Sequence, residues 1–201
     1  MTRMTALLLL MIISTPSYGF LSLMDTGNLV NEGEYRIQGE GQILMDPPEG
    51  FNLNARFATG LDDESEIQFE GGIGSVDYYL GAFYKWMPFP DTDDQPAIGG
   101  RGGVVFADFN GFSTYGFNVT PLISKNISSG YGQFTPYGGI EMSLLNNVDD
   151  TNFSMQAVIG LSWSPNEWEF PGLKKFNFMV EYGAEIDDAF NYFSFGANYN
   201  F

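Results

Sequence analysis

The chain alternates apolar and polar residues with a period of two, and this pattern restricts its possible folds more than any other feature of the sequence. In the last of these rows, apolar residues at every second position from Phe193 to Phe201 alternate with serine, glycine and asparagine. Three further rows are equally clear, at 51–57, 153–163 and 176–186. Because successive side chains of a β-strand point to opposite faces, each row indicates a strand with one apolar and one polar face. We therefore predict an all-β protein.

Weaker alternation fills the intervals between these rows, and turn-like residues separate the segments. We predict about ten strands, at 34–45, 50–60, 65–74, 76–87, 97–109, 112–121, 133–145, 151–163, 174–186 and 190–201. Most are close to the roughly 9–11 residues that a tilted strand needs to cross a bilayer. Asn110-Gly111, between two of them, is a strong hairpin signal. Glycines dilute the alternation at 97–109 and 133–145, so eight and twelve strands are the alternatives.

The composition excludes several kinds of chemistry. The 201 residues include no cysteine and no histidine, and the formal net charge is −17. Without cysteine, disulfides and thiolate metal sites are impossible, and without histidine the chain lacks the commonest general base and zinc ligand. Extended contact with nucleic-acid phosphates needs clustered basic residues. We therefore predict no enzymatic activity, no cofactor, no metal site and no nucleic-acid partner.

The N-terminal residues have the layout of a secretory signal peptide. Arg3 is followed by the apolar run Ala6–Ile13, and Ser17-Tyr18-Gly19 is a small-x-small triplet that favours cleavage before Phe20. The apolar run is far shorter than the about 20 residues of a membrane-spanning helix. We therefore divide the chain into a signal peptide at 1–19, a periplasmic lead-in at 20–33 and a β-barrel domain at 34–201. The lead-in either caps or plugs the periplasmic mouth, or is disordered.

Alternation alone does not separate a membrane barrel from a soluble barrel that binds a small ligand, because both alternate. The apolar rows are rich in aromatic residues, and several of these lie at predicted strand ends, where membrane barrels carry interface girdles. They are Tyr84, Trp86, Trp163, Trp168 and Phe201. The opposite face carries asparagine, glutamine, serine, glycine and charges, which suit a wet or ion-paired lumen better than a dry core. These features favour the membrane barrel.

The signal peptide and the terminal strand Tyr192–Phe201, which ends on an aromatic residue, together resemble those of Gram-negative outer-membrane β-barrels of the porin-like class. The resemblance implies a single closed, antiparallel, up-and-down transmembrane barrel in the cell outer membrane, in contact with its lipid. It also implies that the barrel-assembly machinery is a partner. The residues that would form the assembly signal are Phe193, Phe195, Tyr199 and Phe201. The resemblance leaves the oligomeric state open.

The alternation also places charged residues on the inward face. We expect the lumen to be lined by Arg36, Glu40, Arg56, Glu66, Glu70, Lys85, Arg101, Glu141, Glu181 and Glu185. Barrels of eight strands are filled by side chains, whereas sixteen or more strands leave a channel. A lumen of about ten strands is therefore either plugged by its own ion pairs or narrowly conducting. Because acids outnumber bases, a conducting lumen would prefer cations.

Two functions follow from this arrangement. The first is a structural barrel or small cation-preferring pore with a charged, partly plugged lumen. The second is a surface-binding barrel that acts through its outer turns. With both termini periplasmic, the outer turns would be the short ones, at 46–50, 74–75, 110–112, 146–151 and 187–190. Barrels of this class usually have long outer loops, so short outer turns weaken the surface-binding alternative.

Overall fold

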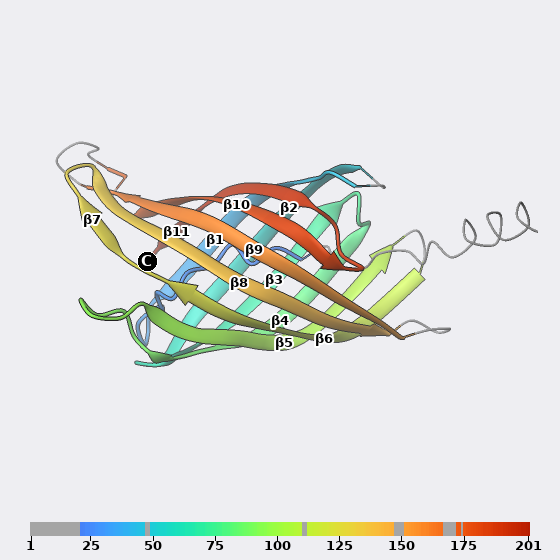
Figure 1. Ribbon diagram of the computed structural model, residues 1–201, viewed down its shortest axis with the longest axis horizontal. Helices are drawn as coiled ribbons and strands as arrows, with labels where there is room; N and C mark the ends of the chain where they lie inside the picture. The colour runs from blue at the N-terminus through green and yellow to red at the C-terminus, as the bar shows by residue number, and fades with distance from the viewer. Residues whose placement is uncertain (1–20, 47–48, 110–111, 147–150, 167–171, 174) are drawn as a thin grey trace, which may run out of the picture.

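The protein is a closed antiparallel barrel, and the predicted all-β fold is confirmed (Figure 1). The computed structural model describes residues 21–46, 49–109, 112–146, 151–166, 172–173 and 175–201. The signal-peptide prediction, Phe20, Asn110-Gly111 and Trp168 lie outside these residues. The strands are β1 (Tyr35–Leu44), β2 (Gly50–Asp62), β3 (Ser65–Gly74), β4 (Tyr78–Phe89), β5 (Ala97–Phe109), β6 (Phe112–Ser124), β7 (Ile127–Ser129), β8 (Gly132–Asn146), β9 (Thr151–Pro165), β10 (Phe176–Asp187) and β11 (Tyr192–Asn200).

Ten of the strands in the described part of the chain form the barrel, which agrees with the predicted number. Neighbouring strands are antiparallel, and β1 closes the barrel by pairing with β11 from Arg36↔Asn200 to Leu44↔Tyr192. The short strand β7 was not predicted. It pairs with the first residues of β8 and extends the sheet beyond the barrel wall (Figure 1). Three residues without alternation give too little pattern for a strand to be read from the sequence.

The predicted strand ends agree with the observed ones to within a few residues. The largest shift is in β6, which continues to Ser124 although the alternation suggested an end at residue 121. Pro121 has no backbone N–H and lies in a break of the ladder between β6 and β8. The ladder from β6 to β5 is unbroken at this point, because Pro121 pairs with Gly100 there. A proline at a ladder break therefore leaves the strand intact.

The two ends of the barrel differ in the length of their connections. At one end, which we call the short-turn end, hairpins are joined by 45–49, 75–77, 110–111, 147–150 and 188–191. The other end, which we call the C-terminal end, has the longer connections 90–96, 125–131 and 166–175 as well as the turn 63–64. Phe201 lies at the C-terminal end and exchanges backbone hydrogen bonds of 2.9 Å with Tyr35.

The outer face of the barrel is apolar and the inner face is polar. Outward side chains such as Ile159 and Leu80 are 66% and 61% exposed, whereas inward polar side chains such as Gln42, Asn52 and Gln68 are fully buried. A soluble barrel has the reverse arrangement, with its apolar side chains inside. The prediction of a membrane barrel is therefore confirmed over the soluble alternative.

Aromatic side chains form a band at the C-terminal end of the barrel. Ring centroids of neighbouring members lie 5.0 to 6.4 Å apart across β8, β9, β10, β11, β1 and β2. The members are Phe134, Trp163, Phe178, Phe176, Tyr199, Phe201, Tyr35 and Phe57. Such girdles mark the level of the membrane interface. Among the described residues, no helix combines the length and apolarity needed to cross a membrane.

The chain before β1 lies inside the barrel. Residues Leu21 to Thr26 are all buried, and Val30 is buried again after three more accessible residues. In Figure 1 this part of the chain, in blue, runs along the interior of the barrel. We call residues 21–30 the lumen segment. Leu21 belongs to the same buried apolar cluster as Val76 and Phe190, which lie in turns at the short-turn end. The lumen segment therefore runs from that end towards the start of β1 at the C-terminal end.

A charge on the lipid-facing side of β9 should destabilise the folded protein. We expect Ile159→Lys to lower the free energy of unfolding in lipid vesicles by about 2–4 kcal/mol, because Ile159 is central in its strand and lysine is costly near the midplane. Denaturant titration of the refolded protein measures this difference. Tyr131→Lys, at an equally exposed position in the connection before β8, is the control, with an expected cost of about 0–1 kcal/mol near the interface. Equal losses in both variants would contradict a bilayer around β9.

The lumen and the segment that fills it

The strand register brings the inward charges into contact. Arg56 on β2 lies opposite Glu70 on β3, and Glu66 on β3 lies opposite Lys85 on β4. Lys85 in turn lies opposite Arg101 on β5. Cross-strand neighbours on one face are close enough for their side chains to interact directly. The pairing of β2, β3, β4 and β5 therefore places all these charges side by side on one part of the lumen wall.

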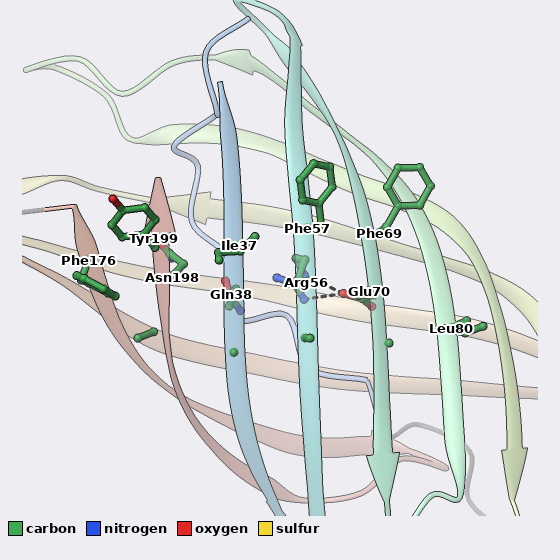
Figure 2. A pocket seen from close by; sticks show the side chains of 14 residues that line it. Ile37, Gln38, Arg56, Phe57, Phe69, Glu70, Leu80, Phe176, Asn198 and Tyr199 are labelled. Atoms are coloured by element: carbon green, nitrogen blue, oxygen red, sulfur yellow. Dashed lines mark hydrogen bonds and ion pairs between the residues drawn. The ribbon is translucent and has the colours of Figure 1, made fainter. Parts of the chain in front are cut away.

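The first ion-pair network joins Glu70 to two guanidinium groups. A Glu70 carboxylate oxygen lies 2.7 Å from Arg56 Nη2 and 3.2 Å from Arg101 Nη1. Arg56 Nε also donates to Glu70 at 2.8 Å. Figure 2 shows Arg56 and Glu70 joined in this way across β2 and β3, with Phe57 and Phe69 at the next positions of the same strands. Glu70 is therefore the only carboxylate that neutralises Arg56 and Arg101 among the ion pairs of the described residues.

The second network includes a residue of the lumen segment. Asp25 Oδ1 lies 2.9 Å from Lys85 Nζ and 3.7 Å from Arg36 Nη2. Glu66 Oε1 lies 2.6 Å from the same Arg36 nitrogen and 3.3 Å from Lys85 Nζ. One acid of the lumen segment and one acid of the barrel wall thus share the same two bases. Asp25 was missed by the sequence analysis, although it is the only charged residue between Phe20 and Asn31, and a lone acid in an otherwise uncharged segment was the available signal.

The three remaining wall acids form no ion pair with the described residues, and hydrogen-bond donors hold each of them instead. Glu40 accepts from Asn54 Nδ2 at 3.2 Å, and Glu141 accepts from Asn118 Nδ2 at 3.1 Å. Glu181 accepts from the hydroxyl of Tyr192 at 2.6 Å. Buried carboxylates need such partners because an uncompensated charge is costly in the interior.

Wall side chains bind the backbone of the lumen segment on both its donors and its acceptors. Glu181 accepts from the N–H groups of Leu23 and Met24, at 2.9 and 2.5 Å. Arg56 Nη1 donates to the carbonyls of Leu23 and Met24, at 2.8 and 3.1 Å. Arg101 Nη2 donates to the carbonyl of Ser22 at 3.0 Å. The segment has no secondary structure, so these contacts supply the partners that its buried backbone requires.

The C-terminal part of the lumen segment is held in the same way. Val30 N–H donates to Glu66 at 2.7 Å and Lys85 donates to the carbonyl of Asn28 at 3.1 Å. Gly27 N–H donates to Ser124 Oγ at 2.8 Å. A Cβ atom at Gly27 would lie 2.5 Å from the Ala97 Cβ, which is closer than such atoms approach, so glycine allows this part of the segment to lie against the wall.

The structure places nine of the ten predicted lumen charges inside the barrel. Glu185 differs, because it is exposed at the short-turn end of β10. The pairing of β10 with β9 shifts register between Glu185 and Asp187, so the regular alternation ends there. A register shift at the rim cannot be read from a pattern that continues through Ile186. The nine buried charges are Arg36, Glu40, Arg56, Glu66, Glu70, Lys85, Arg101, Glu141 and Glu181.

The residues proposed as an assembly signal lie on the outer face. Phe193, Phe195 and Phe201 are exposed, and Tyr199 belongs to the aromatic band at the C-terminal end. Among the described residues, no group of three or more acidic side chains has the arrangement needed to hold a metal ion.

Neither a protein-family model nor a curated protein sequence matches the chain. Solved structures that resemble it include the siderophore receptor PirA from Pseudomonas aeruginosa, with 12% identity and a TM-score of 0.31 over 78% of this chain. The chain covers only 29% of that receptor. The translocator domain of the autotransporter NalP from Neisseria meningitidis has 12% identity and a TM-score of 0.40, over 84% of this chain and 87% of the domain.

The attachment invasion locus protein Ail of Yersinia pestis is a third similar structure, with 12% identity and a TM-score of 0.29 over 85% of this chain and 99% of Ail. The geometry itself carries the assignment of the fold. A closed antiparallel barrel with an apolar exterior, a girdle and a polar lumen is a transmembrane β-barrel of the Gram-negative outer-membrane type.

Removing the charge of Glu70 should destabilise the lumen. We expect Glu70→Gln to lower the free energy of unfolding by about 3–5 kcal/mol, because Arg56 and Arg101 then remain buried without their carboxylate. Heat-dependent migration in detergent, together with denaturant titration, measures the loss. Glu185→Gln removes the same charge from an exposed position and should change stability by less than about 0.5 kcal/mol. A Glu70→Gln protein as stable as the Glu185→Gln protein would refute a structural role of this network.

Proposed function

We propose that the protein is an outer-membrane pore that is closed at rest by its own lumen segment and conducts small cations when this segment leaves the barrel. The observation that carries the proposal is the way the segment is held. Apart from Asp25, its polar contacts with the wall charges are made by its backbone, and six wall side chains provide them. These are Arg36, Arg56, Glu66, Lys85, Arg101 and Glu181.

The segment is attached in a way that permits withdrawal. It joins β1 through residues 31–34 at the C-terminal end, and it contributes no strand to the barrel. With this end towards the periplasm, the segment would leave on the periplasmic side while all ten barrel strands keep their partners. Closure of the barrel does not depend on the segment, because β1 pairs with β11 and β6 with β8.

The charges that remain after withdrawal determine the selectivity. The wall then presents five acids and four bases, since Asp25 leaves with the segment. A ten-strand barrel has little free width, so only small ions would pass. A negative lumen favours cations over anions. Each of the contacts to the segment is replaced by a contact to water when the lumen opens.

The surface-binding alternative has less support. Turns of two to five residues join the hairpins at the short-turn end, and these offer a partner little of the about 800 Å² that a stable protein interface buries on each side. The lumen, in contrast, holds every ion pair of the described residues except the one between Lys125 and Asp91.

Removal of the lumen segment should open the pore. We expect a refolded chain that begins at residue 31 to conduct in planar bilayers, with a preference for K⁺ over Cl⁻, whereas a chain that begins at residue 20 stays closed most of the time. Glu181→Gln in the longer chain should give brief openings, because a neutral amide binds the N–H groups of Leu23 and Met24 less strongly than a carboxylate does.

A peptide of residues 20–31, added on the side of the C-terminal end, should close the shortened pore again. A shortened chain that is folded, as shown by heat-dependent migration, and is as silent as the longer chain would refute the proposal.

The C-terminal strand is proposed to recruit the barrel-assembly machinery. Deleting Phe201, or replacing it with Asp, should reduce the amount of assembled barrel in outer membranes several-fold. Phe201 closes the sheet with Tyr35, and an open strand edge in lipid leaves backbone groups without partners. Tyr131→Asp, an exposed aromatic outside the terminal strand, is the control and should assemble normally. Normal membrane levels of the Phe201 variants would count against this role.

A further inference from the structure

A second feature of the lumen is a cavity beside the lumen segment. It has a volume of about 430 Å³ and lies at the C-terminal end. One side is formed by residues 25–31 and the other by inward side chains of β8, β9, β10, β11 and β1. This volume falls within the range of about 300–1,000 Å³ that is usual for small-molecule sites.

The lining of the cavity is polar and almost uncharged. Carboxamides dominate it, namely Asn28, Asn31, Asn126, Gln133, Asn177, Asn198 and Asn200. The charged residues that reach it already have partners inside the protein. Asp25 is paired with Lys85, Arg36 with Glu66, and Glu34 accepts from Asn31 at 2.7 Å.

Some side chains of the lining are held by hydrogen bonds within the protein, and others are free to bind a ligand. Asn177 is held between Ser164 and Asn198, at 2.5 and 2.6 Å, so its amide has a defined orientation. Within the described residues, the side chains of Gln133, Ser162 and Asn200 have no hydrogen-bond partner, and Ser162 is only 5% exposed. An almost buried hydroxyl beside oriented amides is a binding feature that the closed lumen itself does not use.

We propose that this cavity binds a neutral saccharide of one or two rings. A carboxamide offers both donors and an acceptor, and a serine hydroxyl does the same, which matches the hydroxyl groups of a sugar. An anionic ligand would need a free base, and the only base of the lining, Arg36, is paired with Glu66. Glu34 is the one acid of the lining without an ion pair among the described residues, and its carboxylate is exposed and accepts a hydrogen bond from Asn31. An apolar ligand would leave the amides unsatisfied at a cost.

The cavity exists whether or not the barrel ever conducts, because it is complete while the lumen segment is in place. The segment forms one wall of the cavity, so a bound saccharide stabilises the closed barrel. Binding to the native state alone raises stability in proportion to the logarithm of ligand concentration. Saccharide binding therefore favours the closed pore, and pore closure favours saccharide binding.

Calorimetric titration of the refolded chain from residue 20, in detergent, tests the proposal with glucose, maltose and N,N′-diacetylchitobiose as probes. We expect saturable binding of at least one of them, and a loss of at least tenfold in affinity for Gln133→Leu and for Asn200→Leu. Gln95→Leu, in an exposed connection outside the cavity, is the matched control and should bind as the unaltered protein does. Heat-dependent migration of each variant verifies that it is folded.

Three results would overturn the proposal. They are the absence of saturable binding for all three saccharides, binding that neither cavity variant weakens, and tighter binding of glucose 6-phosphate or glucosamine than of glucose. The last result would show that charge, and not the neutral amide lining, selects the ligand. None of these outcomes bears on conduction by the shortened chain, so the two proposals fail separately.

Discussion

The contact between buried side-chain charges and the backbone of residues 21–30 is the interaction on which the interior of this barrel depends. The segment has no regular structure, so each of its buried N–H and carbonyl groups would cost about 1–3 kcal/mol without a partner. The wall charges in turn would lie in an unfilled lumen without the segment. Arg56 serves both requirements, since it binds Glu70 on the wall and the carbonyls of Leu23 and Met24. Segment and wall therefore satisfy each other.

Much of this architecture could be predicted because a single constraint, the inside-out polarity of a membrane barrel, repeats along every strand. The alternation alone predicted that Arg56, Glu70 and Lys85 lie on the inner face, and they are buried there. The same alternation predicted that Phe193 and Phe195 lie on the outer face, where they are exposed. A pattern with a period of two depends only on neighbouring residues of one strand, so the sequence predicts it wherever the strand is regular.

Features that depend on contacts between distant parts of the chain could not be predicted from the sequence. The sequence before β1 has no periodicity, and Asp25 meets Lys85 only because the segment turns back through the closed barrel. Glu185 was placed inside because it continues the alternation of Glu181, and nothing in that alternation shows that it is exposed where the regular pairing with β9 ends. Likewise β7 exists only because β8 extends beyond the barrel and offers it a partner. In each case the deciding interaction is tertiary.

The central claim is that residues 21–30 occupy the lumen of the folded protein, and the accessibility of a single thiol tests it most directly. The chain has no cysteine, so Ser22→Cys reports only on the segment, where Ser22 is 2% exposed. The account predicts that this thiol resists a water-soluble maleimide in the folded protein and reacts only after denaturation, whereas Ser128→Cys, at an exposed position in β7, reacts at once. Labelling of the two folded variants at equal rates would contradict it.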